Sequence, residues 1–144
     1  MDYIRDTIDY LINFDSLKNS LDNLKCKIIE LQAELKSVKE INYSGMPSGG
    51  GNQEPDDKII NIMYCIEKSK EEFKITKKKI ENIEKVLDKL PKRDKKVIEA
   101  YYIEGLRDES LLKELHCSER QMYIEKKKAL RVLAINLYGI KVIG

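Results

Sequence analysis

The first part of the chain carries an apolar stripe whose members are alternately three and four residues apart. Between positions 17 and 38 the stripe consists of Leu17, Leu21, Leu24, Ile28, Leu31, Leu35 and Val38. This period of about 3.5 residues is typical of a helix that packs along one face against another helix. Upstream, the stripe continues from Ile4 to Phe14 with one extra three-residue step, which overwinds the helix or breaks it. The pattern predicts a helix over about residues 2–41.

A second stripe with the same period ends before Pro91. Its members are Ile59, Ile62, Ile66, Ser69, Phe73, Thr76, Ile80, Ile83, Leu87 and Leu90. The stripe predicts a helix over residues 56–90, and the preceding residues 42–55, rich in Gly and small polar residues, predict a flexible loop. This loop allows the second helix to fold back on the first as an antiparallel coiled-coil hairpin. Pairing between two chains would bury the same residues.

After residue 90 the long periodic stripes give way to shorter apolar patterns. Three short helices are expected, the first starting at Pro91 and ending at Gly105, with an inward face formed by Val97, Ile98, Tyr101, Tyr102 and Leu106. The second ends near His116 and the third begins after Cys117. The chain is therefore predicted to be all-α, with a helical hairpin over residues 1–90 and a separate helical domain over residues 91–144.

The tripeptide His116-Cys117-Ser118 separates the last two predicted helices. A residue of such a turn commonly takes a positive φ, and His is enriched in that conformation. Ser118 is suited to cap the following helix, because its hydroxyl can accept a hydrogen bond from a free backbone NH. A catalytic Cys-His pair would need side chains that face each other and an orienting partner, which adjacent turn residues rarely provide. We therefore interpret the tripeptide as a structural turn.

Composition and charge narrow the possible functions. Charged residues make up 36% of the chain, and no apolar run reaches the roughly 20 residues that span a bilayer, so we expect a cytoplasmic protein without membrane contact. The three cysteines are far apart and form no CxxC pair, so neither a disulfide framework nor a metal site is expected. Nucleotide motifs and convergent acids are also lacking, so we expect neither a cofactor nor catalytic residues, and no enzyme.

Two helices joined by a short turn, the second one polar and basic outside, predict a helix-turn-helix. Its second helix would enter the major groove of double-stranded DNA. Candidate DNA-contacting residues are Ser118, Glu119, Arg120, Gln121, Tyr123, Lys126 and Lys127 on or before that helix, with Arg93 and Lys96 on the preceding one. Arg, Gln and Glu side chains can read guanine, adenine and cytosine respectively, while Lys suits phosphate contacts.

The segment LPKRDKKVIEAYYIEG…LLKELHCSERQMY…KKKALRVL resembles region 4 of bacterial sigma factors, which reads the promoter −35 element. With the helical first half and the glycine-rich loop, the whole layout is similar to phage-encoded regulators of the ArpU and RinA kind. That resemblance implies activation of phage late genes together with host RNA polymerase. Two departures stand out: His116 replaces the usual turn glycine, and Glu125 occupies a position that is usually apolar. Ile124 could take over that packing, which leaves the rotation of the second helix open by one residue.

Two functions follow from these observations. The preferred one is a sequence-specific DNA-binding transcriptional regulator that forms homo-oligomers through its helical hairpin, because operator symmetry usually mirrors protein symmetry. The alternative is a coiled-coil adaptor that docks on RNA polymerase or another protein without reading DNA. The net charge of residues 91–144 is +4 (12 Lys and Arg against 8 Asp and Glu), which is small for a nucleic-acid-binding surface and slightly favours the adaptor.

Overall fold

The computed structural model describes residues 2–43, 55–107 and 109–144, and the part of the chain so described is helical with no strand. The prediction of an all-α fold is therefore confirmed. The helical segments are α1 (Tyr3–Ile12), α2 (Phe14–Tyr43), α3 (Pro55–Lys89), α4 (Lys92–Ile98), the π-helical η1 (Glu99–Ile103), α5 (Glu109–Leu115), α6 (Glu119–Tyr138) and the 3-10 segment η2 (Gly139–Val142). Most of the predicted loop, residues 44–54, lies outside the described residues.

The predicted helix over residues 2–41 is two helices in the structure. Asn13 separates α1 from α2 with φ −96° and ψ 11°, and its side-chain amide donates a hydrogen bond to the carbonyl of Asp9 at 2.8 Å. The break falls within the extra three-residue step of the apolar stripe. It allows Leu11 and Phe14, on either side of the break, to be buried at 1% and 4% exposure. The irregular spacing therefore marks a true end of helix α1.

The structure divides into two compact units. Unit 1 contains Met1–Lys18 and Lys79–Gly144, and unit 2 contains Asn19–Lys78. This division differs from the predicted boundary at residue 90, because α1 packs against α6 and η1 rather than continuing the first long helix. The apolar stripe of α1 therefore contributes to the unit that contains α4, α5 and α6.

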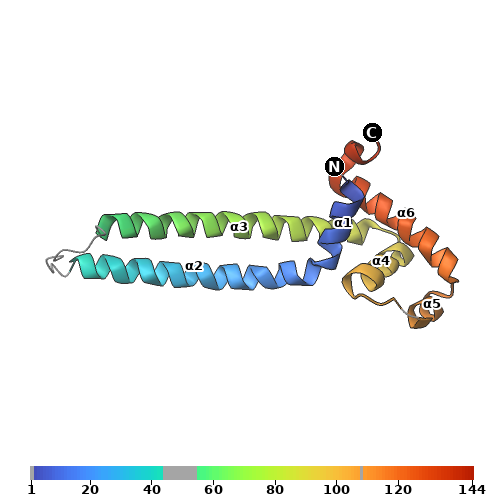
Figure 1. The fold of residues 1–144 in the computed structure, drawn as a ribbon, viewed down its shortest axis with the longest axis horizontal. Helices are drawn as coiled ribbons and strands as arrows, with labels where there is room; N and C mark the ends of the chain where they lie inside the picture. The colour runs from blue at the N-terminus through green and yellow to red at the C-terminus, as the bar shows by residue number, and fades with distance from the viewer. Residues whose placement is uncertain (1, 44–54, 108) are drawn as a thin grey trace. The chain divides into compact units, whose positions relative to one another are not determined.

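Unit 2 consists of most of α2 and α3, which run in opposite directions (Figure 1). The predicted stripe residues of α2 from Leu21 to Val38 are all half-buried, whereas the other positions between Asn19 and Ile41, apart from Ser20, are exposed. On α3 the buried positions of unit 2 are Ile62, Ile66 and Ser69, all of which belong to the predicted stripe. The 3.5-residue periodicity therefore identified the packed face of both long helices.

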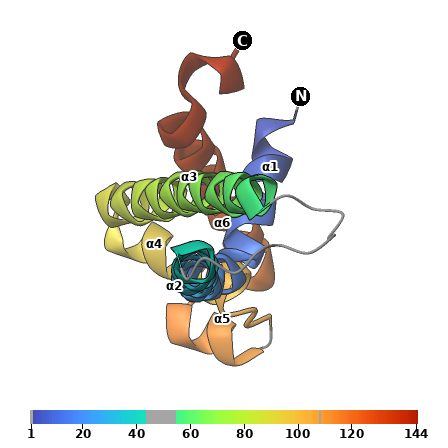
Figure 2. The same cartoon turned by 90° about the vertical axis from the view of Figure 1, so that its left-hand side faces the viewer.

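In unit 1 the start of α1 lies beside the end of α6, as both views show (Figure 1 and Figure 2). The rings of Tyr3 and Tyr138 have centroids 5.0 Å apart. The ammonium of Lys79, at the start of the α3 portion in this unit, lies 4.4 Å from the ring centroid of Tyr10 and 5.0 Å from that of Tyr138. One lysine and three tyrosines thus join α1, α3 and α6 through ring contacts and cation–π contacts.

These contacts change the acid–base behaviour of the cluster. Burial, followed by the nearby Tyr10 and Asp6, raises the pKa of Tyr138 to about 12. Burial also lowers the pKa of Lys79, and the charge of Asp6 partly offsets that effect. The cluster therefore favours a neutral phenol at Tyr138 while it disfavours the ammonium form of Lys79.

We predict that Tyr138→Phe makes the stability of the protein less sensitive to alkaline pH. A phenol in the unfolded chain has a pKa of about 10, so the folded state binds this proton more tightly. The resulting stabilisation is complete below about pH 10 and is lost as the pH rises from about 10 to about 12. Urea-unfolding midpoints between pH 8 and 11.5 should fall more steeply for the natural protein than for the variant. Lys79 titrates in both proteins, so the difference isolates Tyr138.

Tyr64→Phe is the matched control, because it removes the hydroxyl from a tyrosine that is 66% exposed. That variant should follow the natural protein across the same pH range. Parallel curves for the natural protein and Tyr138→Phe would contradict the prediction.

Candidate nucleic-acid interface

Helix α5, a three-residue turn and helix α6 form the helix-turn-helix. Leu111 and Leu115 anchor α5 in the core at 1% and 3% exposure, where they pack with Val97, Ala100 and Met122. The chain then reverses at His116, whose φ is 54°, and the backbone NH of Cys117 donates to the carbonyl of Leu112 at 3.2 Å. The predicted positive φ is therefore confirmed, with His116 in the place that a glycine usually takes.

Ser118 caps the amino terminus of α6. Its Oγ accepts a hydrogen bond from the backbone NH of Gln121 at 3.1 Å, and its carbonyl accepts one from the NH of Met122 at 3.0 Å. The N-cap role predicted for Ser118 is confirmed. This cap fixes where α6 begins, and so fixes the direction in which its first exposed side chains point.

The rotation of α6 follows from its buried residues. The inward face consists of Met122, Ala129, Leu130, Leu133 and Ala134. Ile124 is 49% exposed and does not take over the packing of position 125, whereas the side chain of Glu125 is only 20% exposed. The rotation that the sequence left open is thus decided, with a glutamate on the inward side and an isoleucine outside.

The opposite face of α6 is basic with one apolar residue at its centre. At about 100° per residue, this outer face is formed by Arg120, Ile124, Lys127 and Arg131, all of them exposed. Arg120 and Lys127 were predicted as DNA-contacting residues, and Glu119 and Tyr123 lie at one edge of the face. Ile124 and Arg131 were missed. The spacing of four, three and four residues between these positions would have found them, had the inward side been known.

Glu125 joins α6 to α4. The Nε of Arg93 lies 3.1 Å from both carboxylate oxygens of Glu125, and Nε2 of Gln121 donates to Oε1 of Glu125 at 3.3 Å. Two predicted DNA-contacting residues, Arg93 and Gln121, therefore share one half-buried carboxylate. A charge-assisted hydrogen bond of this kind holds the side chains of both residues in a defined place.

Lys96 also has an acidic partner, since its Nζ lies 2.8 Å from Oε1 of Glu114 on α5. Both side chains are about half exposed, and exposed ion pairs contribute at most about 1 kcal/mol. A phosphate that approached Lys96 could therefore replace Glu114 at small cost.

A cluster of cations and aromatic rings lies at the edge of α6 that carries Tyr123. The Nζ of Lys126 lies 3.9 Å from the ring centroid of Tyr101 and 5.3 Å from that of Tyr123. The guanidinium carbon of Arg107 lies 4.6 Å from the centroid of Tyr101. Of these residues only Lys126 and Tyr123 were predicted as site residues. Arg107 and Tyr101 were missed, because only the folded chain brings them beside α6.

A π-helical turn places Arg107 and Tyr101 together. In η1 the NH of Glu104 bonds the carbonyl of Glu99 at 2.8 Å, and Gly105 follows with φ 74°. This geometry turns the chain away from the core, which corrects the expectation that Leu106 faces inward: Leu106 is 39% exposed. Such π-helical turns often lie at functional sites.

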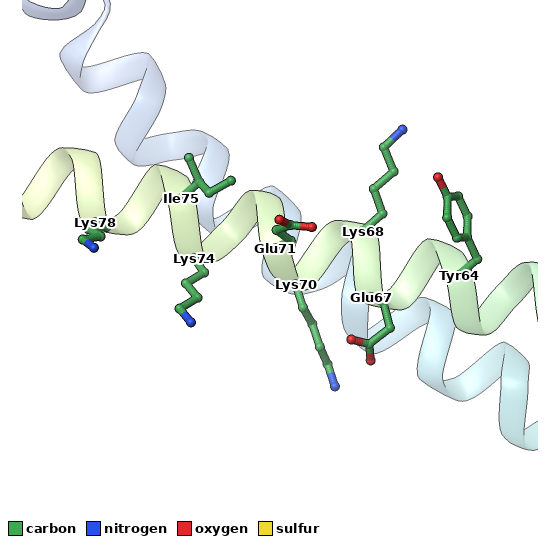
Figure 3. Close-up of a pocket in the computed structure, with 8 residues that line it drawn as sticks. All are labelled: Tyr64, Glu67, Lys68, Lys70, Glu71, Lys74, Ile75 and Lys78. Atoms are coloured by element: carbon green, nitrogen blue, oxygen red, sulfur yellow. The ribbon is translucent and has the colours of Figure 1, made fainter.

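Other kinds of site find little support in the structure. Eight side chains of α3, from Tyr64 to Lys78, surround a shallow hollow, but they come from a single helix and point to different sides of it (Figure 3). Within the described ranges no three His, Cys, Asp or Glu side chains are arranged to hold a metal ion. None of the helices in those ranges is long and apolar enough to cross a membrane.

By fold, the chain is an all-α protein with an antiparallel helical hairpin and a helix-turn-helix. Residues 34–134, more than half of the chain, match the family described as "Protein of unknown function (DUF1492)", and the chain belongs to that family. No curated protein and no solved structure is similar enough to the chain to count as a match. The family description assigns no activity, so a function can be proposed only from the geometry and chemistry of the candidate interface.

We predict that Ser118→Ala lowers the free energy of unfolding by about 1 kcal/mol, because it removes the acceptor for the NH of Gln121. Ser118→Asp keeps an acceptor at the same position and should remain within a few tenths of a kcal/mol of the natural protein. Urea titrations of the three proteins would measure both differences. An unchanged free energy of unfolding in Ser118→Ala would show that the cap contributes nothing, and an equal loss in both variants would show that a side-chain acceptor at this position is not enough.

Proposed function

We propose that the chain is a sequence-specific DNA-binding transcriptional regulator that places α6 in the major groove. The observation that carries the proposal is the outer face of α6, where Arg120, Ile124, Lys127 and Arg131 are exposed on a helix that begins at a capped turn. A helix-turn-helix presents its second helix to base edges in this way. This role requires neither a catalytic residue nor a cofactor.

The residues near the start of α6 have the chemistry for reading bases. Arg120 can donate two hydrogen bonds to guanine, and the methyl groups of Ile124 can contact the methyl of thymine. Glu119, at the edge of the face, can accept a hydrogen bond from cytosine. The mixture of donors, an acceptor and an apolar group suits discrimination between bases better than a uniformly basic face would.

Glu125 is well placed to orient Gln121 for the same task. Because Nε2 of Gln121 donates to Glu125, the amide cannot exchange its oxygen and nitrogen without losing that bond. The remaining NH and the carbonyl oxygen together offer one donor and one acceptor, the combination that adenine matches in the major groove. We therefore propose that Glu125 orients the side-chain amide of Gln121, and that Gln121 reads the base.

Phosphate contacts would supply most of the affinity. Lys127 and Arg131 are exposed on the outer face, and Arg93 and Lys96 can exchange their carboxylate partners for phosphate oxygens. Each neutralised phosphate releases counterions, so affinity should fall as salt rises.

The biological role comes from the resemblance to sigma factor region 4. On that basis we propose that the protein activates phage late genes with host RNA polymerase, that it acts in the cytoplasm, and that the helical hairpin contributes to homo-oligomer formation. The half-buried stripe of α2 leaves apolar surface that a further chain can cover.

A protein-binding adaptor is the second candidate. It is favoured by the ion pairs of Arg93 with Glu125 and of Lys96 with Glu114, which neutralise two cations near the reading helix. In that role the outer face of α6 would contact an acidic protein surface instead of DNA.

The deciding experiment is selection of bound duplexes from a random DNA pool, run in parallel with the natural protein and the Arg120→Ala/Gln121→Ala variant. We expect a consensus for the natural protein that blurs in the variant, with a cost of about 1–3 kcal/mol for each lost base contact. Lys127→Ala is the matched control. It should weaken binding to all sequences alike and leave the consensus unchanged. No enrichment with the natural protein would reject DNA reading and favour the adaptor.

A further inference from the structure

Two cations contact the ring of Tyr101, the guanidinium of Arg107 and the ammonium of Lys126. Neither Arg107 nor Lys126 forms an ion pair with a described residue, whereas Arg93 and Lys96 both do. Arg107 is exposed and Lys126 is half-buried against the ring. Two positive charges therefore remain within reach of a single anion at this ring.

Tyr101 holds both cations in place. A cation–π contact is directed at one face of the ring, and it leaves the other N–H groups of the ammonium or guanidinium free to donate. Because each cation centre lies within 5 Å of the same ring centroid, the two are less than 10 Å apart. Their mutual repulsion would be relieved by an anion that contacted both.

The hollow beside this ring is open and of mixed charge. Besides Tyr101, Arg107 and Lys126 it is lined by Tyr123, Leu112, Met122, Glu109 and Glu119. The two glutamates disfavour a free, fully mobile anion. A phosphate of a rigid duplex would instead be held against these cations by the other contacts of the same helix with the duplex.

The cluster lies on one side of the reading face of α6, and Arg93 lies on the other. At about 100° per residue, exposed Gln121 lies at one edge of the outer face, with half-buried Glu125 next to it toward the core. Exposed Tyr123 lies at the opposite edge, with half-buried Lys126 next to it toward the core. Glu125 brings Arg93 to the first edge, and Tyr101 brings Arg107 to the second. A helix in the major groove has one phosphate backbone along each of its two edges. Cations on both edges match that arrangement.

We propose that Tyr101, Arg107 and Lys126 form a clamp for one backbone phosphate of double-stranded DNA, on the strand opposite to the one that Arg93 contacts. The inference rests on the proposed function and adds two residues to it, Arg107 and Tyr101, that lie outside the helix-turn-helix itself. The clamp supplies affinity and register, and it does not read bases.

The test measures affinity for a selected duplex and for an unrelated duplex over a range of salt concentrations, with the full chain. Arg107→Ala should weaken binding to both duplexes by about tenfold and reduce the slope of log affinity against log salt by about 1. Tyr101→Leu should have a similar but smaller effect, because both cations lose their platform. Arg107→Lys and Tyr101→Phe keep the charge and the ring respectively, and should bind almost as the natural protein does.

Lys141→Ala removes an exposed cation from η2 and serves as the control for net charge. It should leave the slope unchanged. Circular dichroism and thermal unfolding of every variant would show that the fold is kept. Unchanged affinity and slope in Arg107→Ala would overturn the clamp while the proposed function stands, and so would a loss confined to the selected duplex. Failure of the natural protein to bind either duplex would overturn both.

Discussion

The bond between Arg93 and Glu125 is the interaction on which the proposed interface depends most. It places a glutamate on the inward side of α6, and it fixes which residues of that helix face outward. With this rotation Arg120, Ile124, Lys127 and Arg131 share one face. A rotation that turned Ile124 inward and exposed Glu125 would also turn Arg120 inward, because Arg120 lies one helical turn before Ile124 on the same side of the helix. The chemistry offered to a partner would then be far less basic.

The inward glutamate is tolerated because it is not left alone in the core. Its side chain keeps about a fifth of its surface exposed and has two nitrogen partners, the guanidinium of Arg93 and the amide of Gln121. Burial of an unpaired carboxylate would be costly, whereas a paired and partly solvated one contributes little either way. The pair therefore orients the side chains of Arg93 and Gln121 more than it stabilises the fold. In the proposed function, a phosphate can compete with Glu125 for Arg93.

The features that were predictable from sequence are those that depend on local periodicity or on the chemistry of a single residue. The stripes of α2 and α3 required only the 3.5-residue spacing, and the turn at His116 and the cap at Ser118 required only the preferences of those residues. Three features were not predictable. Packing of α1 on α6 joins segments more than 100 residues apart, the inward position of Glu125 contradicts the hydrophobic pattern, and the π-helical turn that exposes Leu106 has no strong sequence signal.

These three features have a common consequence for the candidate site. Sequence reasoning selected Arg120 and Gln121 because they stand at the amino-terminal end of the predicted helix, directly after Ser118. It missed Arg107 and Tyr101, whose place beside α6 is set by the turn after η1, and it missed Arg131 because the inward side of the helix was undecided. The two edges of α6 thus receive their cations from different structural causes, an ion pair to α4 on one side and an aromatic ring on the other. In the proposed function, a helix with both edges held in this way can contact two phosphate backbones at once, which is the reason for proposing duplex DNA rather than a flat protein surface as the partner of α6.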